Sequence, residues 1–160
     1  MKKTHSFLLL LLIFVLFACG VPSQANLGKS GDGKNESINK EIRQLVVDNE
    51  HIKITVLNMK KIKKNSKTTV TVHFDILNKR EDTIKIQAQR LSVDDRMVDA
   101  AIYQMEQEIS PQKAANAKLT IRQTEDAEFP EFENDMEMEL LISSLEDPSY
   151  TETRHVKIIY

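Results

Sequence analysis

A single cysteine is the residue with the most clearly defined chemistry in this sequence. Cys19 follows a basic start at Lys2 and Lys3, an unbroken run of eleven apolar residues, Phe7–Phe17, and the small residue Ala18. A basic stretch, a short apolar stretch and a small residue before the cleavage point are the parts of a secretory signal. The apolar run is well short of the roughly 20 residues that a transmembrane helix needs. The stretch therefore predicts export from the cytosol.

Leu16, Ala18 and Cys19 resemble the lipobox of bacterial lipoproteins, which reads Leu-x-(Ala/Gly)-Cys, with Phe17 at the middle position. The resemblance implies a signal peptide over residues 1–18, a diacylglycerol thioether on Cys19, and a mature chain anchored to the outer face of the cell membrane. Two acyl chains suffice for stable anchoring, since each buried methylene contributes about 0.8 kcal/mol. Two alternatives stay open: a simple secretory signal with an incidental cysteine, and an uncleaved anchor.

A lysine cluster is the second candidate site. Its five members surround Asn65-Ser66, and they are Lys60, Lys61, Lys63, Lys64 and Lys67. Clustered lysines favour contact with anionic surface material such as lipid headgroups or wall polymers. The alternative is a merely solvated tip of a β-hairpin.

Three histidines and two methionines carry weaker signals. His51, His73 and His155 each lie on or beside an expected strand. They alternate with apolar residues, so we expect them to face solvent. A metal cluster of the three histidines would require their strands to be neighbours. Met136 and Met138 are soft ligands that suit copper. They share a strand face with Leu140 and Ile142, however, so we expect them to pack in the core. We predict no metal and no cofactor.

An acidic tract runs from Glu125 to Glu139 with eight carboxylates and no base. It lacks the ligand spacing and the glycine of a calcium loop. We interpret Thr124–Asp135 as a solvated irregular loop. A hydrolase would need a carboxylate pair in a cleft, which this tract could supply only if it were buried.

Composition limits the remaining function classes. The 160 residues carry a formal net charge of −2, and removal of residues 1–18 makes it more negative because Lys2 and Lys3 are lost. The chain therefore has no general attraction for nucleic acid or for anionic lipid headgroups. With no second cysteine, an exported domain must depend on its core rather than on a disulfide. About 120 residues after the tether suffice for one domain.

The composition also predicts the domain boundaries. Residues 19–40 are polar and contain all four glycines, which predicts a flexible tether with an r.m.s. span of about 25 Å. Gly28-Lys29-Ser30 lacks the first glycine of a phosphate-binding loop. Residues 41–160 form the predicted folded domain.

Alternating apolar residues predict seven or eight short strands and little helix. The pattern is clearest at Val70–Ile76 and Ile84–Val93, which we expect to pair as a hairpin across a loop of about five residues. Ile38, Ile42 and Leu45 have helical spacing, which favours a short helical lead-in before the first strand. The sum predicts an all-β, two-layer antiparallel sandwich.

The arrangement of Val70–Val93 resembles the immunoglobulin-like modules of uncharacterised lipoproteins from low-GC Gram-positive bacteria. In those modules a Pro-Gly-Lys turn precedes a Leu-x-Ile strand, and Pro111-Gln112-Lys113 and Leu119-Thr120-Ile121 stand at the matching places. The resemblance spans roughly residues 45–160. It implies an immunoglobulin-like β-sandwich at the cell surface and no assigned activity.

These observations favour a non-enzymatic, membrane-anchored binding module whose partner is a protein or an envelope polymer. One alternative is an accessory subunit of an envelope transport or stress-response complex. The other is a cell-envelope hydrolase that uses acidic residues.

Overall fold

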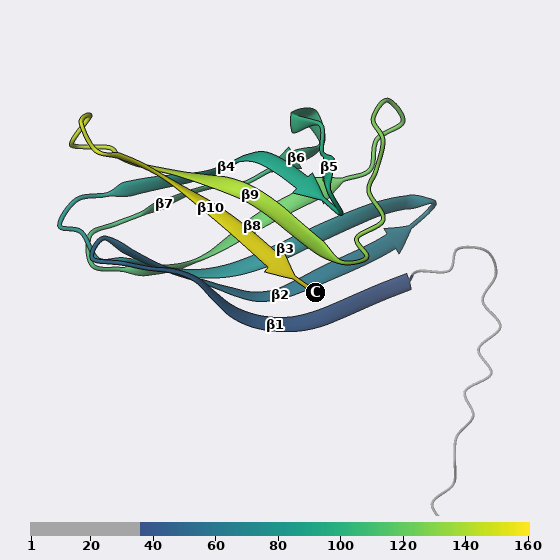
Figure 1. Ribbon diagram of the computed structural model, residues 1–160, viewed down its shortest axis with the longest axis horizontal. Coiled ribbons are helices and arrows are strands. Elements are labelled where there is room, and N and C mark those ends of the chain that lie inside the picture. Colours follow the sequence, from purple (N-terminus) through teal and green to yellow (C-terminus); the bar gives the residue numbers. More distant parts are fainter. Residues whose placement is uncertain (1–35) are drawn as a thin grey trace, which may run out of the picture. The chain divides into compact units, whose positions relative to one another are not determined.

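The computed structural model describes residues 36–160. The predicted signal peptide, Cys19 and most of the predicted tether lie outside the described residues. Residues 36–160 form two antiparallel β-sheets packed face to face (Figure 1), as the alternating apolar pattern predicts. They contain ten strands rather than seven or eight. No helix within this range is long and apolar enough to cross a membrane.

The first sheet has the strand order β1-β2-β3-β8-β6. Its strands are β1 (Glu36–Asp48), β2 (Ile52–Lys64), β3 (Lys67–Asn78), β8 (Ala114–Arg122) and β6 (Tyr103–Gln104). The second sheet has the order β10-β9-β4, with β5 and β7 both pairing with β4. Its strands are β10 (Thr151–Ile159), β9 (Asp135–Ser144), β4 (Ile84–Val93), β5 (Arg96–Met97) and β7 (Glu106–Ile109). A single 3₁₀ turn, η1 (Ala100–Ile102), precedes β6.

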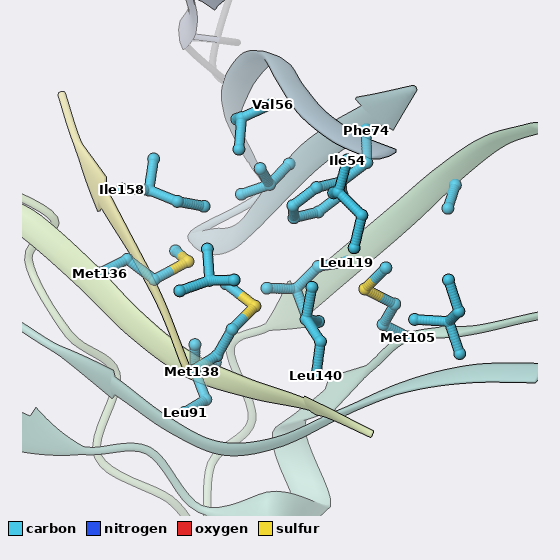
Figure 2. Close-up of a cluster of buried hydrophobic side chains, with 14 of the residues drawn as sticks. Ile54, Val56, Phe74, Leu91, Met105, Leu119, Met136, Met138, Leu140 and Ile158 are labelled. Atoms are coloured by element: carbon cyan, nitrogen blue, oxygen red, sulfur yellow. The ribbon is translucent and has the colours of Figure 1, made fainter. Parts of the chain in front are cut away.

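The core lies between the inner faces of the two sheets (Figure 2). Val72 and Phe74 reach it from β3, and Met136 and Met138 reach it from β9. The Phe74 side chain is fully buried, as are both methionines. The alternation that predicts these strands therefore also identifies their inner faces correctly.

The predicted helical lead-in is wrong. β1 runs as one strand through all of Glu36–Asp48, and its first five residues belong to the stretch that we predicted as tether. The register shifts between Glu41 and Gln44, where Arg43 adopts a φ of 53°. This bulge inserts an extra residue and interrupts the two-residue alternation of the strand. The apolar residues of β1 therefore have a spacing that resembles that of a helix.

The predicted hairpin of β3 and β4 is also wrong. β3 pairs with β2 and β8, whereas β4 belongs to the second sheet. The loop between them crosses from one sheet to the other. Alternation shows which face of a strand is buried, but it does not select the strand's neighbour.

Polar side chains join the loops at the end of the sandwich where β3 leads into β4. The buried Asn78 amide donates to the carbonyls of Asp82, Ile109 and Ser110, at 2.8, 3.0 and 3.1 Å, and its Oδ1 accepts from the Arg80 backbone N–H. The Arg80 guanidinium pairs with Asp82 and lowers the pKa of that carboxyl to about 2. We call this the closed end, because its polar groups are engaged with one another.

One side of the sandwich is also closed. The Gln44 side-chain amide of β1 donates to the Lys157 carbonyl of β10 at 2.8 Å. From Gln44 onward, β1 therefore lies beside the edge of the second sheet. Within residues 36–160, the segment of β1 before Gln44 pairs only with β2.

Candidate functional site

The predicted lysine cluster lies at the end of the sandwich opposite the closed end, on the hairpin of β2 and β3. Asn65 and Ser66 form its two-residue turn with φ values of 50° and 64°, which suit a type I′ turn. The structure divides the cluster between two surfaces. A bulge at Leu57 shifts the alternation, so that Val56 and Met59 are both buried. The lysines after Met59 then alternate between the inner and the outer side.

Lys61 and Lys63 lie on the inner side. The Lys61 ammonium donates to the Glu131 carbonyl at 2.9 Å and lies 5.9 Å from the centroid of the Phe132 ring. Both lysines line a hollow of about 300 Å³, together with Phe129. Lys61 therefore holds the loop between β8 and β9 against the hairpin, and we assign it a structural role.

The acidic tract forms that loop, as predicted, and continues into β9. The Asp94 carboxylate fastens it by accepting hydrogen bonds from the backbone N–H groups of Glu133, Asn134 and Asp135, at 2.8, 2.7 and 3.2 Å. Within residues 36–160, no group of three or more histidine, cysteine or acidic residues is arranged to hold a metal ion.

The outer lysines join two cations that the sequence analysis did not single out. Lys118 and Arg122 lie on β8, and they alternate with the buried Ala117, Leu119 and Ile121. The register of the first sheet places Lys118 opposite His73 of β3, and Arg122 opposite Thr69. We call the resulting outer surface the cationic face. It consists of Lys60, Lys64, Lys67, Lys118 and Arg122.

The cations of this face have few partners. Within residues 36–160, only Lys67 among them lies within 4.0 Å of a carboxylate, that of Glu125. The outer face of the second sheet differs, because Lys85, Arg90 and Lys157 all pair there with glutamates, at 3.2, 3.1 and 2.8 Å. The chain thus neutralises its cations on one face and leaves them exposed on the other.

His73 reports the positive potential of the cationic face. Its pKa is lowered, first by partial burial and then by the charges of Lys118 and Lys60. Protonation of His73 would place a third positive charge between these two. An anion bound here would remove part of that penalty.

The other two histidines lie elsewhere. His51 occupies the closed end, edge-on to the Tyr150 ring at 5.4 Å between centroids. His155 lies on the outer face of the second sheet, 3.6 Å from Glu137. The structure therefore places the three histidines in three separate surroundings.

No protein-family model matches the sequence, and no curated protein matches it. Among solved structures, the chain is similar to the FixG-related protein from Vibrio parahaemolyticus, with a TM-score of 0.38 and 12% sequence identity. The match covers 71% of this chain and 97% of that chain. A likeness of this size bears on neither the activity nor the partners of this chain.

Proposed function

We propose that this chain is a lipid-anchored, extracytoplasmic binding module without catalytic activity, which docks on anionic phospholipid headgroups through its cationic face. The observation that carries the proposal is the asymmetry of charge pairing between the two outer faces. Unpaired lysines near a membrane attract anionic lipids with about 1 kcal/mol per residue. Paired lysines, such as Lys85 with Glu106, are already neutralised.

The point where the chain enters the domain supports the same orientation. Glu36, the first described residue, pairs with Lys63 beside the tip of the β2–β3 hairpin (Figure 1). A lipid on Cys19 would therefore hold the domain by its basic end. The acidic loop lies at this end too, where it joins β8 of the first sheet to β9 of the second. Its Glu125 lies 4.0 Å from Lys67 of the cationic face, but its later part packs against Lys61 on the inner side of the hairpin, away from the outer face of the first sheet.

A flat membrane suits this surface better than a linear polymer does. The cations are spread over three neighbouring strands, and Ile62, which is 36% exposed, lies among them. An apolar side chain between lysines is typical of surfaces that lie at the headgroup boundary. A polymer would instead require the charges to follow one line.

The anchor is tested by the mass of the chain recovered from bacterial membranes. We expect a polypeptide that begins at Cys19 and carries the added mass of a diacylglycerol group. A Cys19→Ser variant should lack this mass and leave the membrane fraction after cleavage by ordinary signal peptidase or remain unprocessed. An unmodified full-length chain in the wild type would refute the anchor.

The docking face is tested with residues 19–160 carrying Cys19→Ser, so that no acyl chain contributes. We expect Lys60→Gln with Lys118→Gln to weaken partitioning to phosphatidylglycerol vesicles at low salt by about 30-fold, from about 1 kcal/mol per lysine. The matched control is Lys85→Gln with Lys157→Gln, which changes the net charge equally on the other face and should have little effect.

A second readout of the same titration is the pKa of His73 followed by NMR. Vesicle phosphates should raise this pKa, because they offset the charges of Lys118 and Lys60. Equal losses in both double variants would show attraction without a defined face. Retention on isolated anionic wall polymer, without binding to vesicles, would replace the membrane by a polymer.

A further inference from the structure

The N-terminal half of β1 is an open sheet edge. All six residues of Glu36–Glu41 are exposed, and on one side they pair with β2, from Glu36 opposite Lys63 to Glu41 opposite Asn58. On the other side, no strand of residues 36–160 pairs with them. Every second residue of such an edge directs its N–H and C=O outward, ready to bind another strand.

This edge has only part of the usual protection. Proteins block open edges with proline, with bulges, with charged side chains, or by covering them. Glu36, Lys40 and Glu41 supply charges, but of both signs, so they repel a second copy in some registers and attract it in others. Glu36–Glu41 contains no proline, and the bulge at Arg43 comes only after it. Gln44 closes the rest of β1 against β10. Ile38, in the middle of the open segment, is 52% exposed.

We propose that this edge pairs with the same edge of a second copy of the chain, in antiparallel orientation and centred on Ile38. In this register Glu36 faces the partner's Lys40, Ser37 faces the partner's Asn39, and the two Ile38 side chains meet. The two-fold axis repeats each pair, so the dimer gains two pairs of opposite charge. The two first sheets become one continuous sheet.

Backbone geometry and charge together select this register over its neighbours. A shift by one residue, centred between Ile38 and Asn39, is excluded by the backbone, because it would oppose residues that point to opposite faces of the sheet. Centring on Asn39 would place Ile38 opposite the partner's Lys40. Like charges directly opposite each other destabilise a strand pair, and opposite charges stabilise it.

The geometry also connects the dimer with the cationic face. Directly opposed residues of an antiparallel pair point to the same side of the sheet. The two cationic faces therefore lie on one side of the joined sheet, and one flat surface can contact both. The pairing itself does not depend on the proposed membrane function, so each can fail alone.

The test uses the full chain in the cells that make it, with cysteine crosslinking at the open edge. We expect Ile38→Cys to give a disulfide-linked dimer on oxidation, because the two Cα atoms of a directly opposed pair lie about 4.5–5.5 Å apart, within the range that a disulfide spans. Ser37→Cys is the matched control, since Ser37 faces Asn39 rather than itself, and it should crosslink far less. The wild-type chain measures any background from Cys19.

Charge reversal in the Ile38→Cys chain tests the register. Lys40→Glu or Glu36→Lys should each reduce the crosslinked dimer about tenfold, since each creates two like-charge pairs. Co-expression of the two variants with different tags should restore crosslinking as a mixed dimer. Both residues are exposed, and the mixed dimer shows directly that each variant is folded.

Three outcomes would overturn the proposal. They are equal crosslinking at positions 37 and 38, insensitivity to Lys40→Glu, and capture of a different protein in place of a second copy. If residues 19–160 did not bind anionic vesicles but the Ile38→Cys chain still crosslinked, the membrane function alone would be refuted.

Discussion

Asn78→Ala should lower the free energy of unfolding by about 3 kcal/mol, because it leaves several buried carbonyl groups at the closed end without a donor. The Asn78 amide serves the carbonyls of Asp82, Ile109 and Ser110 and receives the Arg80 N–H. One side chain thus joins the end of β3, the loop that changes sheets and the end of β7. Urea denaturation followed by circular dichroism would measure the loss.

The matched control is Asn116→Ala on β8, where the asparagine is exposed on the outer face. Substitutions at such positions usually change stability by less than about 0.5 kcal/mol. If Asn78→Ala and Asn116→Ala had the same midpoint as the wild type, the closed end would not depend on this amide.

Phe74→Ala should have the larger effect, a loss of about 4 kcal/mol, because it leaves a cavity in the middle of the core. Phe74 is fully buried on β3 and lies between the strands of both sheets (Figure 2). A domain with the usual stability of about 5–15 kcal/mol would then be close to unfolding at room temperature. Thermal denaturation monitored by circular dichroism would detect the shift.

Phe129→Ala is the comparison for this effect. Phe129 is only partly buried on the loop between β8 and β9, so its loss should cost less than about 2 kcal/mol. A Phe129→Ala chain that was less stable than the Phe74→Ala chain would contradict the placement of the core.

The sequence predicts the class of fold because alternation survives in most strands. Val70–Ile76 and Met136–Ile142 alternate without interruption, and both have the predicted inner faces. It fails where a bulge breaks the period, as at Arg43. It also fails to assign β3 and β4 to separate sheets, because a loop of five residues can either turn a hairpin or cross between layers.

The sequence predicts the candidate site only in part, because bulges and the pairing of distant strands decide which side chains share a face. The lysines of the hairpin are evident as a cluster, but the bulge at Leu57 decides which of them face outward. Lys118 and Arg122 join them only through the pairing of β3 with β8, which are far apart in the sequence. Their alternation with Leu119 and Ile121 was a readable sign of an exposed basic strand face.

The two borders of the first sheet are unequal, and this sets how many molecules can associate. At the far border β6 is only two residues long, Tyr103–Gln104, and the adjoining β8 lies against β7 of the second sheet. Among residues 36–160, β1 is the border of the first sheet with the longer run of unpaired backbone. A sheet with one open edge can pair with one neighbour, whereas a sheet with two open edges could extend into a fibre. Under the proposed pairing through β1, the short β6 limits assembly through the first sheet to two molecules.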